Sequence, residues 1–482
     1  MFGLMQDWPL LMHKVLDHAA IQHPGREIIS RSVEGPFHRT DYRELRLRAL
    51  RLAQRLERGG IRLGDRVATL AWNTWRHVEA WYGITGIGAI YHTVNPRLFP
   101  DQIAWILNHA GSRVLMLDLS FIPLIQQLAP KLEHVERFII LTDGAHLPET
   151  GLRNAVAYED WLAEADGDFA WASFDEKTAA GLCYTSGTTG DPKGVLYSHR
   201  SNILHALACN QVDCLGLGVA DRVMPVVPMF HANGWSLPIS APMAGATLVL
   251  PGAKLDGASV HEIITEAQVN FSAAVPTVWM MLLQHMEATG ARIDSLKRVV
   301  IGGSACPAAI TQTYQEKYGV RVIHAWGMTE MSPVGTTYQR KPEIAALDPT
   351  AALALQAKQG CPPFTVEMKI TDDEGRDLPW NGEVFGRLKV RGPAITRNYF
   401  RREGEAVLDA DGFFDTGDVA TIDTHGFMEV TDRSKDVIKS GGEWISSIAL
   451  ENAAVGYPGV AEAAVVAMYD PKWDERPLMI LV

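Results

Sequence analysis

The stretch Tyr184-Thr-Ser-Gly-Thr-Thr-Gly-Asp-Pro-Lys-Gly194 gathers glycines, hydroxyl groups and one lysine directly after an apolar segment. Glycines let the backbone turn its amide groups toward a bound anion, and the hydroxyl groups add further donors. Lys193 adds a positive charge. A plain surface turn is the alternative for any loop rich in Gly, Ser, Thr and Pro. The density of donors around one lysine favours a phosphate-binding loop instead.

This loop is not of the Walker type. Pro192 separates Asp191 from Lys193, so the spacing Gly-x-x-x-x-Gly-Lys-Ser/Thr is absent. Kinases and GTPases of that type are therefore disfavoured.

Apolar strand-like runs alternate with helical stretches along most of the chain. Strands are expected at 66–72, 113–118, 137–142, 298–303 and 320–325, and an amphipathic helix at 77–90. Strands separated by helices imply parallel sheets covered by helices. We therefore predict the α/β class, with a large N-terminal domain of helix-covered parallel sheets.

The texture changes near residue 360, where Gly and Asp become frequent and the segments shorten. Runs at 383–392 and 426–430 predict antiparallel strands, and so a β-rich subdomain at about 360–434. After the charged break Asp432-Arg-Ser-Lys-Asp436, a helix and strands at 462–468 and 477–482 predict a small α+β domain. The last apolar run is cut by the end of the sequence. We therefore expect this domain to be present only in part.

Composition limits the class of protein. A chain of 482 residues predicts two or three domains. The net charge of −12 argues against general binding to nucleic acid or anionic membranes. No apolar run approaches the ~18 residues of a membrane span, and the N-terminus is no signal peptide, so we expect a cytoplasmic protein without integral membrane association. The five cysteines fit neither a zinc site nor a disulfide framework, and we expect reduced thiols in the core.

The loop at 184–194 resembles the phosphate loop of the adenylate-forming superfamily, which comprises acyl-CoA synthetases, peptide-synthetase adenylation domains and luciferases. Further motifs of that superfamily follow in the same order, and they are Pro228-Met-Phe-His-Ala-Asn-Gly-Trp235, Gly302-Gly-Ser-Ala-Cys-Pro307, Trp326-Gly-Met-Thr-Glu330, Phe414-Asp-Thr-Gly-Asp418 and Thr431-Asp-Arg-Ser-Lys-Asp-Val-Ile-Lys-Ser-Gly-Gly-Glu-Trp-Ile445. The resemblance covers essentially the whole chain. It implies a large domain at 1–434 and a small mobile domain at 435–482, with the hinge at Lys435.

The resemblance also implies site residues. The catalytic group comprises Thr185, Lys193, His231, Thr329 and Glu330, and Glu330 is the expected Mg²⁺ ligand. The nucleotide- and CoA-binding group comprises Ser186, Gly187, Thr188, Thr189, Gly190, Gly303, Ser304, Ala305, Trp326, Gly327, Asp418, Arg433, Lys439 and Trp444. The acyl pocket comprises Trp235, Gly302 and Val334.

Taken one at a time, several of these residues have ordinary explanations. A lone histidine such as His231 is more often a satisfied core residue, and Trp235 fits a plain core aromatic almost as well. Glu330 alone would be read as a solvated surface carboxylate. Ser304 is not expected to be a nucleophile, because Cys306 replaces the last glycine of a Gly-x-Ser-x-Gly elbow. The ordered set of motifs reverses the first three interpretations.

The implied activity is that of an AMP-forming acyl-CoA ligase, which uses ATP, Mg²⁺ and coenzyme A and is expected to be a homodimer. The motif at 228–235 and the start of the chain most resemble medium-chain fatty-acyl-CoA ligases and 3-(methylthio)propionate-CoA ligases. A short- to medium-chain aliphatic acid is therefore the expected substrate. An aryl-acid CoA ligase and a non-catalytic nucleotide-binding relative remain alternatives. The superfamily's adenylation lysine lies in a Ser-Gly-Lys sequence that this chain does not reach, so we expect the chain as it stands to adenylate poorly.

Overall fold

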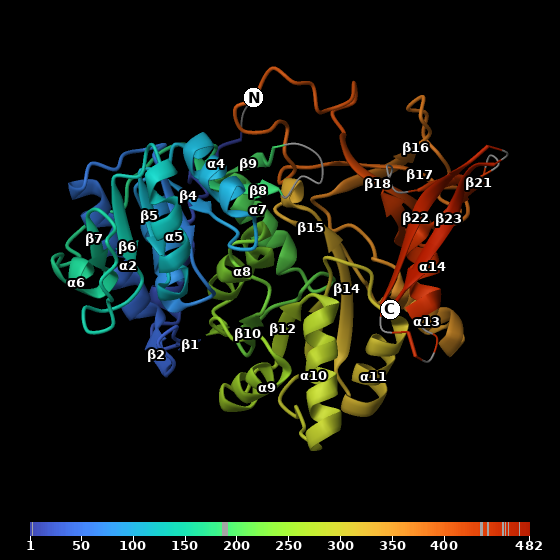
Figure 1. The fold of residues 1–482 in the computed structure, drawn as a ribbon, viewed down its shortest axis with the longest axis horizontal. Coiled ribbons are helices and arrows are strands. Elements are labelled where there is room, and N and C mark those ends of the chain that lie inside the picture. The colour runs from blue at the N-terminus through green and yellow to red at the C-terminus, as the bar shows by residue number, and fades with distance from the viewer. Residues whose placement is uncertain are drawn as a thin grey trace.

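The chain forms two large, mainly parallel sheets followed by two small antiparallel sheets (Figure 1). The computed structural model describes residues 1, 3–185, 191–433, 437–440, 443–455, 457, 459–460, 462–471 and 473–482, without the side chains of 439, 443, 444, 449, 452, 455 and 474. The predicted α/β class with a β-rich subdomain is confirmed.

The first large sheet has eight strands in the order β15-β14-β13-β12-β10-β11-β1-β2. Its strands are β1 Glu27–Arg31, β2 Phe37–Asp41, β10 Arg222–Pro225, β11 Thr247–Leu250, β12 Phe271–Ala274, β13 Arg298–Ile301, β14 Arg321–Gly327 and β15 Val334–Thr337. All neighbours pair in parallel except the two edge strands β2 and β15. Strands β11 and β12 are buried at every residue, as expected for parallel strands covered on both faces.

The second large sheet has seven strands in the order β7-β6-β5-β3-β4-β8-β9. Its strands are β3 Arg66–Leu70, β4 Ile90–Thr93, β5 Val114–Leu117, β6 Arg137–Ile140, β7 Ala155–Ala157, β8 Ala179–Thr185 and β9 Lys193–Ser198. Only the β8–β9 pair is antiparallel. The segment that links β8 and β9 therefore contains the phosphate-loop motif.

Helices cover both large sheets. The α-helices are α1 His13–Gln22, α2 Tyr42–Arg58, α3 Trp75–Gly86, α4 Pro100–Ala110, α5 Ile122–Leu128, α6 Tyr158–Ala163, α7 His199–Cys209, α8 Leu237–Met243, α9 Gly257–Glu266, α10 Pro276–Thr289, α11 Ala308–Tyr318, α12 Pro342–Ala345, α13 Pro349–Ala357 and α14 Ser447–Val455. The helix predicted at 77–90 is α3, and its predicted end was wrong. Gly88 has φ +74°, a conformation that suits glycine and breaks a helix, and Ile90 already begins β4.

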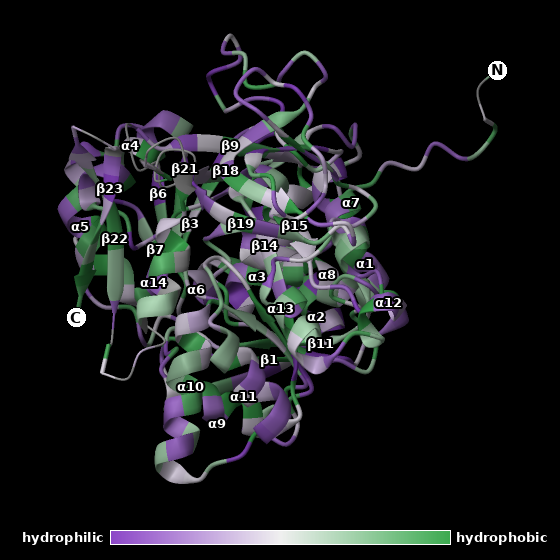
Figure 2. Ribbon diagram, turned by 90° about the vertical axis from the view of Figure 1, so that its right-hand side faces the viewer, coloured by the Kyte–Doolittle hydropathy of each residue, from purple (hydrophilic) through white to green (hydrophobic). Residues whose placement is uncertain are grey.

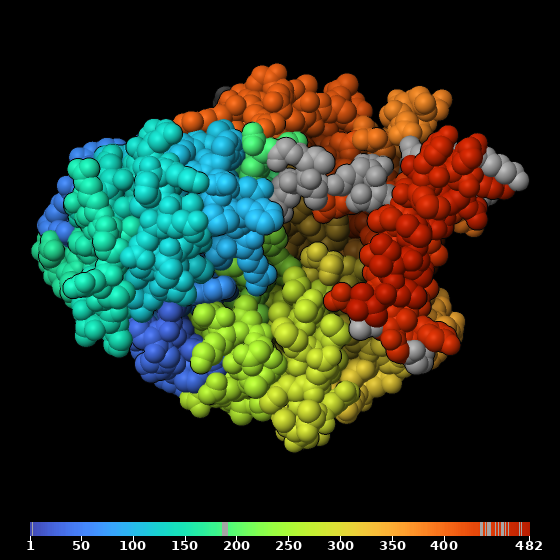
Figure 3. Space-filling model, in the orientation of Figure 1, coloured from blue at the N-terminus to red at the C-terminus, as the bar shows by residue number. Residues whose placement is uncertain are grey.

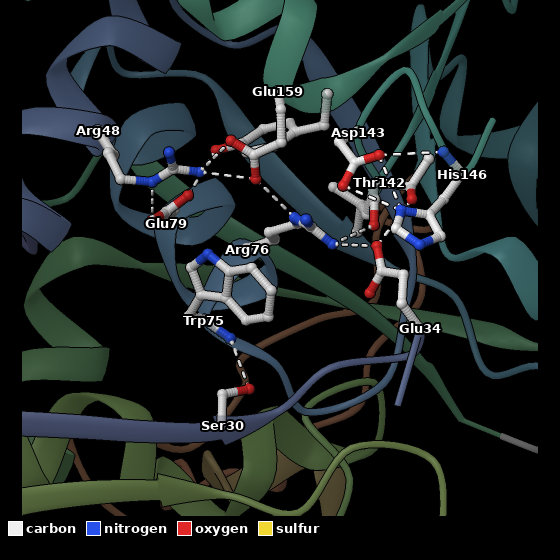
Figure 4. A network of polar contacts seen from close by, with 12 residues as sticks. Ser30, Glu34, Arg48, Trp75, Arg76, Glu79, Thr142, Asp143, His146 and Glu159 are labelled. Atoms are coloured by element: carbon white, nitrogen blue, oxygen red, sulfur yellow. Dashed lines mark hydrogen bonds and ion pairs between the residues drawn. The ribbon is translucent and has the colours of Figure 1, made fainter. Parts of the chain in front are cut away.

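A buried ionic network joins the two large sheets (Figure 4). Arg76 of α3 bonds Glu34 at 2.8 Å and Glu159 at 2.7 Å, and Glu34 follows β1 whereas Glu159 belongs to α6. Arg48 of α2 bonds Glu79 at 2.6 Å and also reaches Glu159. Because these charges are paired inside the protein, the relative position of the two sheets is fixed by directional bonds as well as by the shared core.

The predicted β-rich region forms a four-stranded antiparallel sheet of β16 Glu367–Thr371, β17 Gly386–Arg391, β18 Phe414–Ile422 and β19 Met428–Arg433. The C-terminal unit pairs β20 Ile438–Ser440, β21 Glu443–Ile445, β22 Ala463–Asp470 and β23 Asp474–Leu481, with α14 against them. Figure 3 shows this unit in red at one side of the molecule, beside the orange and yellow segments.

Three further observations concern the thiols, the N-terminus and the helices. All five cysteines are buried and free, as predicted. The N-terminal stretch extends away from the body (Figure 2), with Leu4 and Met5 exposed. In the described part of the chain, no helix has the length and apolarity needed to cross a membrane.

Candidate active site

The motif residues gather at the carboxyl ends of the parallel strands. Gly302 directly follows β13, and Trp326 and Gly327 end the neighbouring β14. Thr185 ends β8 of the other large sheet. Open parallel sheets place their ligand sites at this edge, since the loops that follow the strands are free to vary there.

Trp326 and Asp418 form the first polar contact of the site. The indole Nε1 donates to Asp418 Oδ2 at 3.0 Å, which joins β14 to β18 of the β-rich sheet. A Cβ on Gly335 would lie 2.7 Å from the Trp326 ring, so the ring rests on bare backbone. Burial raises the pKa of Asp418 to about 6, against the bond from Trp326 and the charge of Arg433. Asp418 is thus an ionisable acceptor held beside an aromatic face.

Glu330 lies in the short 3₁₀ turn η4 Thr329–Met331 and is 7 % exposed. Tyr399 donates its hydroxyl group to Glu330 Oε1 at 2.8 Å. Burial raises the pKa of Glu330, while the Tyr399 bond and the charges of Lys193 and Arg433 act in the opposite direction. A buried carboxylate with two cationic groups nearby suits a site that binds a metal cation together with an anionic ligand.

Thr185 and Lys193 are direct partners across the β8–β9 pair. The Lys193 Nζ lies 4.9 Å from the centre of the Tyr399 ring. Ser186, Gly187, Thr188, Thr189 and Gly190, predicted to bind phosphate, lie outside the described residues. The strand pair therefore fixes the two ends of the predicted phosphate loop, one of which carries the lysine.

Thr329 is held from the same strand pair. Tyr197 of β9 donates its hydroxyl group to the Thr329 carbonyl oxygen at 2.7 Å, and Thr329 itself is 8 % exposed. This bond ties the turn that carries Glu330 to the strand that begins at Lys193. Sequence patterns gave no signal for Tyr197 or Tyr399, because neither falls within a quoted motif.

Two of the three residues predicted for the acyl pocket, Gly302 and Trp235, lie against each other. A Cβ on Gly302 would lie 2.7 Å from the Ala325 carbonyl oxygen and 3.3 Å from the Trp235 ring. Gly303 has φ +82° and faces the same ring. Val334 begins β15, and its backbone N–H donates to His205 Nε2 at 2.9 Å. The predicted acyl pocket would therefore be bounded here by bare backbone and one large aromatic face.

The segment that carries His231 and Trp235 has an unusual backbone. All five residues of the 3₁₀ turn η3 Ala232–Ser236 have positive φ, and four of them are not glycine. Both amide atoms of Asn233 are buried and have no hydrogen-bond partner among the described residues. Left-handed conformations cost about 1 to 2 kcal/mol for each such residue. Strain of this kind persists where surrounding structure imposes it, and it clusters at functional sites.

Asn73 holds the approach to this strained turn. Its side-chain Nδ2 donates to the Pro225 and Val227 carbonyl oxygens at 2.8 and 2.9 Å, and its Oδ1 accepts from Met229 N at 2.7 Å. Asn73 follows β3, so the second sheet anchors the loop that leaves β10 of the first. Part of the His231 surface is exposed, yet desolvation by the surrounding protein, together with the positive charge of Arg97, lowers its pKa.

The remaining predicted residues lie at the margin of the site. Ser304 is exposed and Ala305 half-buried in the turn after β13. Arg433 ends β19, directly opposite Asp418 in the strand register. Lys439 and Trp444 face each other in the β20–β21 pair, and their side chains are outside the description. The predicted hinge residue, Lys435, lies outside the described residues.

The residues present fit a magnesium ion that arrives with a nucleotide. Within the described ranges no group of three or more His, Cys, Asp or Glu side chains could form a protein cage for a metal. Mg²⁺ commonly binds through one or two carboxylates plus phosphate oxygens. Glu330 would supply one such carboxylate, since its Oε1 accepts one bond from Tyr399 and an ionised carboxylate can accept several.

Comparison with known proteins gives a consistent picture. Residues 16–400 match the family model described as AMP-binding enzyme. The chain is 47 % identical over 482 residues to a 3-methylmercaptopropionyl-CoA ligase of Ruegeria pomeroyi, covering 100 % of this chain and 89 % of the relative. It is 46 % identical over 482 residues to a medium-chain-fatty-acid–CoA ligase of Ectopseudomonas oleovorans, covering 100 % and 88 %. A crystal structure of an anthranilate CoA ligase in complex with anthranoyl-AMP superposes with a TM-score of 0.85 at 26 % identity, covering 99 % and 88 %.

Proposed function

The chain belongs to the family of AMP-binding enzymes, and from that membership we propose that it is an AMP-forming acyl-CoA ligase for a short- to medium-chain aliphatic acid. The observation that carries the proposal is the triangle of Lys193, Glu330 and Tyr399, which places a cation and a buried carboxylate on one tyrosine. Such an arrangement suits a magnesium-bound triphosphate.

The site must first hold ATP. Asp418 can accept both vicinal ribose hydroxyl groups, while Trp326 and the Gly302–Gly303 turn offer flat or bare surfaces to the adenine. Lys193, with the donors that flank it, faces the phosphates. Mg²⁺ at Glu330 would neutralise phosphate charge when bound. These groups reduce the repulsion between the triphosphate and an incoming carboxylate.

Two steps then follow in one site. A carboxylate oxygen of the acid attacks the α-phosphorus, the bond to the β-phosphate oxygen breaks, and pyrophosphate leaves with its electron pair. The product is an acyl-adenylate. In the second step the CoA sulfur attacks the acyl carbon, the thiol proton passes to solvent, and the carbon–oxygen bond breaks so that AMP leaves with the electron pair. Within this proposal His231 lies at the acyl pocket, where the thiol has to approach.

The aliphatic substrate class rests on the pocket wall. Trp235 is 8 % exposed and lies against Gly302 and Gly303, so the wall near the reacting carboxylate is apolar and tight. The two named relatives are almost equally similar to this chain, and one acts on a medium-chain fatty acid and the other on 3-methylmercaptopropionate, as their names state. A 3-(methylthio)propionate ligase is therefore the second candidate.

The experiment is a comparison of kcat/KM for acids from acetate to palmitate, with 3-(methylthio)propionate and benzoate in the same panel. Each acid is assayed for AMP and pyrophosphate with and without CoA. A maximum at butyrate to octanoate supports the main proposal, and a maximum at 3-(methylthio)propionate supports the second. A preference for benzoate would contradict both. Trp235→Ala should move the optimum toward longer acids, because removing the indole deepens the pocket.

The same assay addresses the non-catalytic alternative, since a nucleotide-binding relative would hold ATP and release no AMP. The homodimer, the cytoplasmic location and the hinge at Lys435 remain predictions.

A further inference from the structure

Tyr399 belongs to none of the motifs that indicate the site, yet it contacts two of the residues that define it. Its hydroxyl group donates to Glu330 Oε1 at 2.8 Å. Its ring lies under the Lys193 ammonium, 4.9 Å from Nζ to the ring centre. Tyr399 is 7 % exposed, so water competes little for either contact. One side chain therefore links the lysine that begins β9 with the carboxylate of η4.

The segment that carries Tyr399 is tied to both partners by backbone bonds. Thr396 N donates to the Glu330 carbonyl oxygen at 2.8 Å, and Phe400 N donates to the Gly194 carbonyl oxygen at 2.8 Å. Thr396 precedes Tyr399 by one short turn, and Phe400 follows it directly. The ring and hydroxyl group thus start from a backbone that is already fixed against Glu330 on one side and the Lys193 strand on the other.

The direction of the Tyr399–Glu330 bond follows from the two groups. An ionised carboxylate has no proton to give, so the phenol of Tyr399 donates and Oε1 accepts. Oε1 is then occupied by the phenol. An ionised carboxylate has about four acceptor positions, so Glu330 can still bind a cation beside this bond.

We propose that Tyr399 is a positioning residue for magnesium-bound ATP, which orients Glu330 through its hydroxyl group and supports Lys193 through its ring. The inference rests on the proposed function, because it needs a triphosphate and its cation at this site. Tyr399 touches neither substrate in this account. It acts by fixing the two groups that would contact the ligand, the Glu330 carboxylate at its hydroxyl group and the Lys193 ammonium over its ring.

A purely structural role is the competing explanation. Tyr399 packs in the core of the β-rich sheet, with its ring centre 6.4 Å from that of Phe414. Loss of packing alone would lower thermal stability and weaken all ligands together. The hydroxyl group bonds Glu330 and the ring contacts Lys193, so two substitutions separate the two contacts. Tyr399→Phe removes only the hydroxyl group, and Tyr399→Leu removes the ring as well.

The experiment measures binding by calorimetry in two conditions, ATP with EDTA and ATP with a titration of MgCl₂. For Tyr399→Phe we expect metal-free ATP to bind within about 2-fold of the native protein, while the Mg²⁺ concentration needed for half-saturation rises about 10-fold, as for a lost bond to a charged group. For Tyr399→Leu we expect metal-free ATP to weaken in addition by about 3- to 5-fold, because the cation–π contact with Lys193 is lost.

Tyr314→Phe is the matched control. The Tyr314 hydroxyl group is also buried and donates to the Trp279 carbonyl oxygen at 2.9 Å, and neither residue belongs to a quoted motif. Its loss should change the melting temperature and leave both ATP titrations unchanged. Melting of the ligand-free proteins shows how much of each Tyr399 effect is stability alone.

Two results would overturn the inference about Tyr399. One is an unchanged Mg²⁺ requirement in Tyr399→Phe, and the other is an equal loss of both forms of ATP that tracks the fall in melting temperature. If the native protein binds no ATP in either condition, the proposed function fails and Tyr399 has nothing to position. If the native protein binds ATP and only the variant prediction fails, the proposed function stands.

Discussion

Trp326 and Asp418 are 92 positions apart in the sequence and are joined by one hydrogen bond of 3.0 Å from the indole Nε1 to Oδ2. The bond connects the end of β14 in the eight-stranded sheet with β18 of the β-rich sheet. Together with the charge of Arg433, this bond lowers the pKa of the half-buried Asp418, which partial burial raises. The proposed ribose ligand and the proposed adenine surface are therefore one coupled unit.

The first prediction removes that bond and keeps the ring. Trp326→Phe loses the Nε1 donor, so the pKa of Asp418 should rise above about 6 and the carboxylate should be a poorer acceptor at neutral pH. ATP affinity should fall by about 3- to 10-fold, as for one lost hydrogen bond to a charged group. Titration calorimetry between about pH 6 and pH 8 checks this, because the deficit should shrink at the higher pH. The exposed Trp380→Phe should show no change.

The second prediction concerns the stability that the protein loses when the Asp418 carboxyl group ionises. Its pKa of about 6 in the folded protein exceeds the ordinary 3.8, so the folded state binds the proton more tightly than the unfolded chain. Stability from this group is then present at low pH and is lost as pH rises through about 6. Asp418→Asn should be more stable than the native protein by about 2 kcal/mol near pH 8, a gap that closes below about pH 4.

The charged Asp418 carboxylate lowers stability but should strengthen ATP binding, and the two effects can be measured separately. The same Asp418→Asn protein should bind ATP about 10-fold more weakly, because a neutral amide replaces a charged acceptor. Urea unfolding at several pH values, run with ATP titrations on the same samples, tests both statements. A variant that is less stable than the native protein near neutral pH would refute the assignment of a raised pKa.

The third prediction concerns the strained turn beside the acyl pocket. Asn233 has φ 56° and two buried amide atoms without partners among the described residues. Asn233→Gly relieves both costs, and we expect a net gain of about 1 kcal/mol after the larger entropy of the unfolded chain is counted. Asn154→Gly is the control, with φ 58° and an exposed side chain. Chemical denaturation should show a larger increase in the free energy of unfolding for Asn233→Gly than for Asn154→Gly. Equal increases would mean that the two buried amide atoms of Asn233 cost no stability.

The fourth prediction tests the junction between the two large sheets. Arg76→Met leaves Glu34 and Glu159 without the guanidinium that pairs both, and removing one member of a buried network costs about 3 to 5 kcal/mol. Arg292→Met breaks an exposed pair with Asp294 and should cost about 0 to 1 kcal/mol. Thermal melts of both variants compare the two sites. Similar shifts would mean that the network does not hold the sheets together.

Much of this molecule could be predicted from local pattern. Short apolar runs such as 137–142 became strands because buried parallel strands have to be apolar at every position. The end of the helix after Trp75 was missed, since the apolar pattern continues through Ile87 and Ile90 while the glycines at 86 and 88 allow the chain to turn. The carboxyl-end placement of Gly302 and Trp326 followed from the strand assignments.

The residues that sequence reasoning missed act through space. Tyr399 contacts Glu330 from 69 positions away, and Asn73 holds Met229 from 156 positions away. No periodicity connects such pairs, because the sheet topology alone brings them together. Asn73 had one usable signal, as a polar residue directly after the buried strand β3. The left-handed turn at 232–236 had none, since only one of its five residues is glycine.

The central claim is that this site turns ATP and a carboxylic acid into an acyl-adenylate and then a thioester. The most direct measurement follows the phosphorus products of the full chain by ³¹P NMR with ATP, Mg²⁺, octanoate and CoA. We predict that whatever AMP is formed is matched by an equal amount of pyrophosphate and by acyl-CoA, depends on the acid, and is strongly reduced in Glu330→Gln. Formation of ADP and phosphate, or AMP that appears equally without any acid, would contradict the account.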